Sequence, residues 1–353
     1  MTLDELTAEC KTLGQPAYRA GQLFAWLQQG VASFEEMTNL PKALRDKLLK
    51  NNYISVAYLE KQLVSAYDGT VKFLLRLPDG ETVEAVLMKY KHGNSLCIST
   101  QAGCRMGCKF CATGLQGLSR NLTASEMLDQ IHAAQRETGV RVSHLVLMGM
   151  GEPLDNYDNL LRFLRLVSCE EGLQIGMRHI SLSTCGLVDK IYDLMEEKLQ
   201  LTLSVSLHAP NDRIREQIMP IAHKYGVDEL LKACRDYARV TGRRISFEYA
   251  MIDGVNDSDA CARELAEKLK GMLCHVNLIP ANAVRENSFV KSKLERLGRF
   301  SEILEKNRLN VTVRRTLGAD IEASCGQLRG KKRENPESRT PEGAGLGMGR
   351  DEN

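Results

Sequence analysis

The sequence lacks any apolar run that approaches the ~20 residues of a membrane-spanning helix. Its first residues, MTLDELTAECKTLGQ, are acidic and polar, which is unlike a secretory signal. An excess of one charge is also missing, since 47 lysines and arginines face 45 aspartates and glutamates. A net charge of +2 neither requires nor excludes nucleic acid. We therefore expect a cytoplasmic globular protein without a membrane partner.

The most unusual motif is GCRMGCKFCATG at residues 103–114, where Cys104, Cys108 and Cys111 follow a CxxxCxxC spacing. These three cysteines could bind a metal, but the motif contains no fourth cysteine or histidine that would complete a set of four ligands. The expected reducing compartment argues against a disulfide framework, and clustered cysteines there bind metal or carry out chemistry. A structural zinc site usually has four protein ligands, and no further cysteine or histidine stands nearby at finger-like spacing. A four-iron cluster held by three thiolates has one open iron. This spacing favours a cluster that binds a small molecule.

The chain divides into three regions. Residues 1–60 show helical spacing, as in AYRAGQLFAWLQQG, and residues 61–92 form β-rich runs around DGT and PDGE, which predicts a hairpin or meander. From residue 93, strands alternate with amphipathic helices, which predicts an α/β fold with a parallel sheet, either open or closed into a barrel. One helix is predicted to begin with a capping box at Thr123 and Glu126 and to stop near Gly139. Candidate strands cover residues 95–100, 144–148, 179–183, 201–207, 245–252, 275–279 and 310–315.

Polar residues and glycines gather where these strands end. A glycine pair alone usually marks a turn, and a lone histidine is more often a structural residue than a ligand. However, the carboxyl ends of parallel strands meet at one rim, which is where ligands bind in such folds. The residues predicted to meet there, beside the three cysteines, are Gly151, Glu152, Ser183, Ser206, His208 and Asn282.

These motifs resemble those of radical S-adenosylmethionine (SAM) enzymes, and more closely the RlmN/Cfr family of RNA adenine methyltransferases. The resemblance covers about residues 15–328 and includes YRAGQLFAWL, ETVEAVLM, LCISTQAGCRMGCKFCATG, LMGMGEPLDNYDN, SLHAPND, NLIPAN and GADIEASCGQL. It implies a partial TIM barrel of the (β/α)6 type at residues 93–328. Residues 1–92 would form an RNA-binding accessory domain of helices and a β-hairpin, and residues 329–353 a disordered tail. Ala281 and Ala283 depart from the family pattern around Asn282.

The resemblance also implies the cofactors. Cys104, Cys108 and Cys111 would hold a [4Fe-4S] cluster whose open iron binds SAM, of which two molecules are consumed per turnover. The positions that match the family's SAM contacts are Gly151, Glu152, Ser183, Ser206, Leu207, His208 and Asn282.

Three further residues match the family's catalytic positions. Cys325 would receive a methyl group from the first SAM, and the methylene radical formed from it would add to the adenine. Glu84 would accept the C2 proton of the resulting covalent RNA intermediate. Cys97 would then attack the sulfur of Cys325, which releases the product and leaves a disulfide. The remaining cysteines are interpreted as buried structural residues: Cys10, Cys169, Cys185, Cys234, Cys261 and Cys274.

The expected product is 2-methyladenosine in 23S rRNA at the peptidyl-transferase centre, and also in the tRNA anticodon loop. One alternative is methylation of adenine C8, the antibiotic-resistance activity of the same family. The other is a zinc-stabilised RNA-binding module without catalysis. We expect a monomer that receives electrons from a donor such as flavodoxin or ferredoxin. Candidate contacts to the RNA backbone are Arg105, Lys109, Arg120, Arg314 and Arg315.

Overall fold

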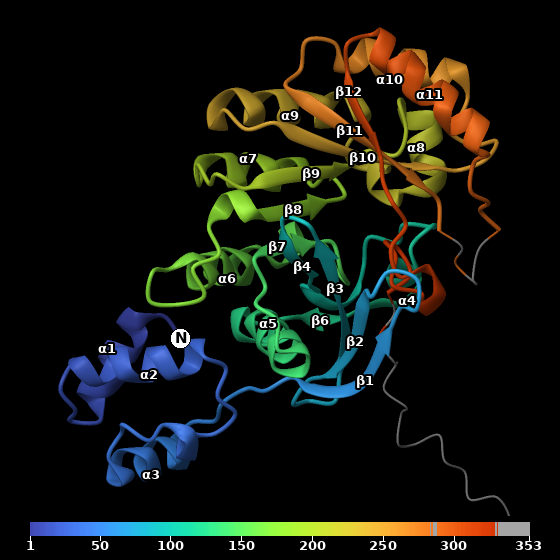
Figure 1. Ribbon diagram of the computed structural model, residues 1–353. Coiled ribbons are helices and arrows are strands. Elements are labelled where there is room, and N and C mark those ends of the chain that lie inside the picture. The colour runs from blue at the N-terminus through green and yellow to red at the C-terminus, as the bar shows by residue number, and fades with distance from the viewer. Residues whose placement is uncertain (283, 285–287, 329, 331–353) are drawn as a thin grey trace, which may run out of the picture.

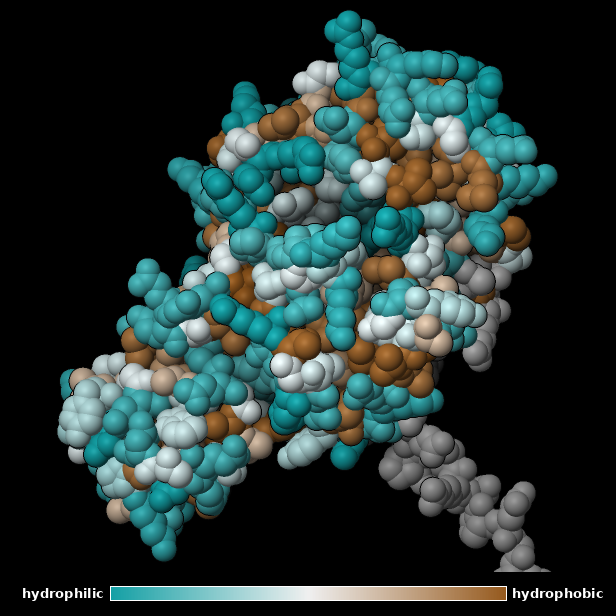
Figure 2. Space-filling model, in the orientation of Figure 1, coloured by the Kyte–Doolittle hydropathy of each residue, from teal (hydrophilic) through white to brown (hydrophobic). Residues whose placement is uncertain are grey.

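The computed structural model describes residues 1–282, 284, 288–328 and 330 (Figure 1). The predicted disordered tail, apart from Gly330, and Ala283 lie outside the described residues. Among the described residues, no helix has both the length and the apolar character needed to cross a membrane. Hydrophilic side chains cover much of the face seen in Figure 2, and hydrophobic groups form separate patches between them.

The N-terminal helices form a lobe at one end of the molecule (Figures 1 and 2). They are α1 (Leu3–Thr12), α2 (Tyr18–Gln28), the short helix η1 (Phe34–Glu36) and α3 (Lys42–Asn51). A capping box between Thr2 and Glu5 begins α1. The helical prediction for this region is confirmed.

The predicted meander follows this lobe. It consists of β1 (Tyr58–Val64), β2 (Val71–Arg76) and β3 (Thr82–Tyr90), paired antiparallel in sequence order. However, β3 also pairs antiparallel with β4 (Gly93–Cys97), with Val86 opposite Cys97. The sheet is therefore continuous across residues 92 and 93, and the division of the chain at this point stays a prediction.

Parallel strands form the rest of this sheet, whose order is β1-β2-β3-β4-β7-β8-β9-β10-β11-β12. Each strand from β4 to β12 in this order pairs parallel with its neighbour. The strands after β4 are β7 (His144–Leu147), β8 (Ile180–Thr184), β9 (Thr202–Ser206), β10 (Ile245–Met251), β11 (Cys274–Pro280) and β12 (Asn310–Val313). The predicted α/β fold with a parallel core is confirmed.

Helices connect the parallel strands, as expected for crossover connections (Figure 1). The predicted capping box between Thr123 and Glu126 is present, and Gly139 ends the same helix in a left-handed conformation. The helices are α5 (Ala124–Thr138), α6 (Tyr157–Ser168), α7 (Val188–Glu196), α8 (Asp212–Ile218), α9 (Val227–Thr241), α10 (Asp259–Leu269) and α11 (Leu294–Lys306).

A small hairpin that the sequence did not predict carries the cysteine loop. It consists of β5 (Gln101–Cys104) and β6 (Gly117–Asn121), with α4 (Ala112–Gln116) between them. Gly103 has a φ of +80°, and a Cβ added there would lie 2.0 Å from the carbonyl oxygen of Gly117. Only glycine fits this close approach of the two strands.

Candidate active site

A pocket opens at the carboxyl ends of the parallel strands, where the sequence predicted a binding rim. Residues from the cysteine loop and from the segments after β7, β8, β9 and β11 line it together. The predicted site residues in its wall are Cys104, Cys108, Cys111, Gly151, Glu152, Ser183, Ser206, His208, Asn282 and Cys325. Segments that lie far apart in the sequence thus converge on one cavity, as the topology predicted.

Three thiols of the cysteine loop face this cavity, of which Cys104 is buried and Cys108 and Cys111 are half-buried. Burial, with smaller effects of nearby acidic groups, raises the pKa of Cys104 to about 12. Burial also raises the pKa values of Cys108 and Cys111, and the other two cysteines add to the effect at Cys108. The thiolate forms of such a trio repel one another and require a nearby positive charge. The donor set therefore fits an iron–sulfur cluster, whose irons bind thiolates and supply that charge.

The loop after β7 is held against the cysteine hairpin by Gln101. The Gln101 side chain accepts a hydrogen bond of 2.8 Å from the Glu152 backbone N–H and donates one of 3.0 Å to Asp155. Gly151 has a φ of +105°, and a Cβ there would lie within 3.0 Å of Gln101. Glycine is therefore required at this position. Sequence reasoning missed Gln101, although it joins two predicted cofactor-binding segments.

The Glu152 carboxylate joins the same loop to the end of β8. It accepts hydrogen bonds from the backbone N–H groups of Leu154 at 3.0 Å and Cys185 at 2.7 Å. Burial raises the pKa of Glu152, although these hydrogen bonds oppose the shift. Cys185, which sequence reasoning treated as a structural cysteine, lines the pocket beside it.

His208, which follows β9, is held in a strained backbone conformation with a φ of +56°. Its Nδ1 accepts a hydrogen bond of 2.8 Å from the backbone N–H of Ala250, so Nε2 carries the proton of the neutral ring. Burial, followed by the charge of Arg215, lowers the pKa of His208 to about 3. The imidazole therefore stays neutral near pH 7, and its ring packs edge-on against Phe110 at a centroid distance of 4.8 Å.

Leu207 differs from its two neighbours in where its side chain lies. Ser206 and His208 on either side of it line the pocket, whereas Leu207 is fully buried in the hydrophobic core. Consecutive residues of an extended segment face opposite sides, so the Leu207 side chain points away from the cavity. The assignment of Leu207 as a cofactor-binding position stays a prediction.

Cys325 is placed against the cysteine loop by contacts on both sides. The side-chain amide of Asn282 donates a hydrogen bond of 2.9 Å to the Cys325 carbonyl oxygen. The carbonyl oxygen of Gly326 accepts one of 2.8 Å from the backbone N–H of Ala112, directly after Cys111. The Thr113 hydroxyl donates to the Leu328 carbonyl oxygen at 2.5 Å. Asn282 therefore positions a predicted catalytic cysteine as well as lining the pocket.

A second cavity shares Cys325 with the first and contains Cys97. Met148, Asn282 and Arg314 line both cavities. Burial, followed by the nearby Cys325 thiol, raises the pKa of Cys97 to about 12. The structure thus brings together the two isolated cysteines that the sequence predicted to act in one reaction.

Arg314 lies at the junction of these two cavities. Its guanidinium is 3.6 Å from the Glu248 carboxylate, whose other contacts include a hydrogen bond of 2.9 Å from the Asn277 amide. The negative charge of a Cys325 thiolate raises the pKa of Arg314 above its usual value. The sequence proposed Arg314 as an RNA-backbone contact, whereas the structure places it in one cavity with Cys97 and Cys325.

Glu84 lies on β3 but lines neither of the two cavities. It is 6% exposed and forms an ion pair of 3.0 Å with Lys72. Its side chain is on the same face of β3 as that of Val86, which lines the second cavity opposite Cys97. Its assignment as the proton acceptor stays a prediction.

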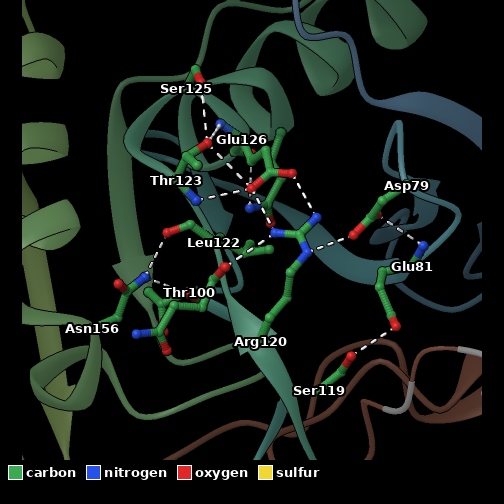
Figure 3. A network of polar contacts seen from close by, with 12 residues as sticks. Asp79, Glu81, Thr100, Ser119, Arg120, Leu122, Thr123, Ser125, Glu126 and Asn156 are labelled. Carbon is green, nitrogen blue, oxygen red and sulfur yellow. Dashed lines mark hydrogen bonds and ion pairs between the residues drawn. The ribbon is translucent and has the colours of Figure 1, made fainter.

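The other basic candidates differ in their contacts. Arg120 binds Glu126 through two hydrogen bonds and Asp79 through a third, which occupies its guanidinium (Figure 3). Arg105 pairs with Asp155 but its side chain is 64% exposed. Lys109 and Arg315 are exposed, and Arg315 also lines the second cavity. The structure therefore favours a structural role for Arg120.

Comparisons with known proteins cover most of the chain. Residues 98–271 match the family model of the radical SAM superfamily, and residues 1–54 match that of the ribosomal RNA large subunit methyltransferase N-terminal domain. The chain is 53% identical over 335 residues to "Probable dual-specificity RNA methyltransferase RlmN" of Alkaliphilus oremlandii, which covers 95% of this chain and 98% of that relative. A relative of the same name from Desulforamulus reducens is 55% identical over 320 residues, covering 90% and 91% of the two chains.

One solved structure is similar over nearly the full length. The crystal structure of a radical SAM methyltransferase from Sphaerobacter thermophilus superposes with a TM-score of 0.89 at 46% sequence identity. The similarity covers 93% of this chain and 98% of that chain.

Proposed function

Because the chain belongs to the RlmN family of radical SAM RNA methyltransferases, we propose that it methylates C2 of adenine in both 23S rRNA and tRNA. The rRNA target would lie in the peptidyl-transferase centre and the tRNA target in the anticodon loop. The observation that carries this proposal is that Cys97 and Cys325 line one cavity, directly beside the pocket of the three clustered cysteines. Family membership leaves the zinc-stabilised binding module without support.

The cofactors are those of the radical SAM superfamily, a [4Fe-4S] cluster and SAM. We assign Cys104, Cys108 and Cys111 as the cluster ligands. When bound, these cofactors supply the methyl group and the radical chemistry that an adenine C2 carbon requires. Gly151 allows Gln101 to pack against the pocket wall, and Ser183, Ser206 and the Nε2–H of His208 offer polar groups that orient SAM.

The reaction at sulfur is assigned to Cys325, whose thiolate accepts the methyl group. The guanidinium of Arg314 stabilises this thiolate, and the hydrogen bond from Asn282 fixes the backbone that carries it. Glu84 is assigned to take up the C2 proton of the covalent adduct, whose unpaired electron the bound cofactors would accept. This last role requires Glu84 to release Lys72, its ion-pair partner.

Release of the RNA is assigned to Cys97. Its thiolate attacks the Cys325 sulfur, so a sulfur–sulfur bond forms and the carbon–sulfur bond breaks. The electron pair of the broken bond goes to the former methylene carbon, which takes up a proton and becomes the methyl group of the product. The enzyme is left with a disulfide between Cys97 and Cys325, which an external thiol reduces.

The adenine must leave its base stack to reach these cavities. Single-stranded or looped RNA makes this less costly than a duplex. Arg105, Lys109 and Arg315 are exposed near the cavities and suit contacts to phosphates. A one-electron donor such as flavodoxin or ferredoxin would reduce the cluster, and we propose that the enzyme acts as a monomer in the cytoplasm.

The test of this function is mass spectrometry of nucleosides from 23S rRNA and tRNA treated with the reconstituted enzyme. We expect 2-methyladenosine in both RNAs when synthetic 2-methyladenosine and 8-methyladenosine serve as standards. Mainly 8-methyladenosine would overturn the choice of C2 and leave the cysteine assignments standing. Product in rRNA alone would remove only the tRNA part.

A further inference from the structure

Arg215 of α8 is fully buried beside the cofactor pocket, where it binds the ends of two core strands. Its Nη2 donates hydrogen bonds to the carbonyl oxygens of Cys185 at 2.6 Å and Ser206 at 3.2 Å, and its Nε donates to that of Leu207 at 3.1 Å. Nη1 reaches the Tyr225 carbonyl oxygen at 3.5 Å. The guanidinium therefore joins the carboxyl ends of β8 and β9, which present predicted SAM contacts.

The contacts of Arg215 are with neutral groups. In the described part of the chain, Arg215 forms no ion pair within 4.0 Å, and the Asp212 carboxylate acts on it only from a greater distance. A fully buried cation without a counter-charge carries a large desolvation cost, which backbone carbonyl dipoles offset only in part. An anion that binds nearby would therefore be strongly favoured.

The nearest group that would carry negative charge is the iron–sulfur cluster that the cysteine loop would hold. Cys108 packs against the cluster of Cys185, Ile218 and Met219, and Arg215 binds the carbonyl oxygen of the same Cys185. One helical turn after Arg215, the Ile218 carbonyl oxygen accepts a hydrogen bond of 2.9 Å from the backbone N–H of Lys109. The next residue, Met219, lines the pocket with Cys108. Helix α8 thus connects the strand ends directly to the cysteine loop.

We propose that Arg215 is a positioning residue that supplies the buried counter-charge of the iron–sulfur cluster and fixes the rim where SAM binds. This inference rests on the proposed assignment of Cys104, Cys108 and Cys111 as cluster ligands. The reduced cluster carries one more negative charge than the oxidised cluster, so a nearby cation stabilises the reduced form more. Arg215 therefore raises the reduction potential of the cluster.

The test uses the full-length chain after anaerobic reconstitution, as wild type, Arg215→Gln, Arg215→Lys and Arg213→Gln. Arg213 lies on the same helix and is exposed, so its variant is the matched control. The midpoint potential of the cluster is measured by redox titration followed by electron paramagnetic resonance without SAM. We expect Arg215→Gln to disfavour reduction about tenfold, which is a shift of about 59 mV to lower potential for one electron.

Arg215→Lys keeps the charge but makes fewer contacts with the carbonyl groups, so its potential should change less than threefold while its affinity for SAM falls. Arg213→Gln should match the wild type in both measurements. A wild-type potential in Arg215→Gln, or an equal shift in Arg213→Gln, overturns the proposal. If Arg215→Gln holds no cluster, the potential of Arg215→Lys is the deciding measurement. This variant keeps the positive charge, so a tenfold change in its reduction equilibrium would contradict the role of charge. A wild type that binds no four-iron cluster refutes the cysteine assignment itself.

Discussion

Cys97 and Cys325 line one cavity, but replacing each of them should stop the proposed reaction at a different step. Cys97→Ala keeps the sulfur to which RNA becomes attached and loses only the thiol that releases it. We expect protein covalently bound to RNA to accumulate, with less than one product per enzyme. Cys325→Ala should give neither the adduct nor product. Denaturing gel electrophoresis, with and without RNase, detects the adduct. Normal turnover by Cys97→Ala would refute its assigned role.

The protonation state of Cys97 sets a second prediction at the scale of one residue. Burial, followed by Cys325, raises its pKa to about 12, so the thiol keeps its proton near pH 7. The attacking species is the thiolate, whose fraction rises about tenfold per pH unit below the pKa. Release of RNA from preformed adduct should therefore accelerate about tenfold for each pH unit between 7 and 9. A pH jump followed by quenching at successive times measures this rate.

Cys97→Ala is the control for the pH experiment, since its adduct should persist at every pH in this range. If wild-type release were independent of pH, attack by a free Cys97 thiolate would not limit it. That result would indicate that another group in the complex removes the Cys97 proton.

The functional residues divide into those that the sequence predicted and those that it could not. The strand-end rule and the family resemblance located Gly151, Glu152 and His208 because each stands next to a recognisable run of apolar residues. Gln101 and Arg215 were missed because their function consists of hydrogen bonds to segments distant in the sequence. No local pattern marks such contacts.

At the scale of elements, the cysteine hairpin depends on Arg120 to join three segments (Figure 3). From β6, Arg120 binds Glu126 in the first turn of α5 and Asp79 in the turn between β2 and β3. Glu126 also accepts hydrogen bonds from the Thr123 backbone N–H in the capping box. Its side chain is 8% exposed, whereas that of Asp79 is 42% exposed.

Glu126 and Asp79 both bind the Arg120 guanidinium, so replacing each of them in turn gives a matched comparison. Glu126→Ala leaves the partly buried Arg120 without its bidentate partner and removes the Glu126 half of the capping box, so we expect a loss of about 3 kcal/mol. Asp79→Ala removes an exposed partner and should cost at most about 1 kcal/mol. Urea unfolding of both variants measures the difference. Equal losses would contradict the dominant role of Glu126.

The strands show how far sequence reasoning reached at the scale of elements. Runs such as ISFEYAMI and HVNLI predicted β10 and β11 within one residue at each end, because β10 is buried along its whole length and alternate residues of β11 are buried. The run 95–100 was predicted as one strand, but β4 ends at Cys97. The short strands β5 and β6 carry glycine, cysteine and polar residues, so they have no such pattern.

At the scale of the whole molecule, the N-terminal lobe packs against α5 and α6 through apolar side chains and a few polar contacts. The Nε2 of His132 on α5 lies 3.1 Å from the carbonyl oxygen of Gln28 at the end of α2. Arg162 of α6 pairs with Glu5 of α1. Gly30 packs against the His132 ring, and a Cβ added to it would lie 2.6 Å from that ring. The placement of the lobe thus depends on the absence of a side chain at residue 30.

Replacing Gly30 should therefore displace the lobe from the core. Gly30 and Gly14 both follow a helix with a positive φ, +77° and +68°. Alanine at either position adds about 1–2 kcal/mol of backbone strain. A Cβ on Gly14 meets no atom within 4 Å, so Gly14→Ala is the control for strain alone.

We expect Gly30→Ala, unlike Gly14→Ala, to accelerate hydrogen exchange in α1 and α2 and to weaken RNA binding at least tenfold. Cleavage of SAM without RNA should stay unchanged in both variants, because the cofactor pocket contains no residue of this lobe. If Gly30→Ala bound RNA as tightly as Gly14→Ala, the fixed position of the lobe would not contribute to recognition of the substrate.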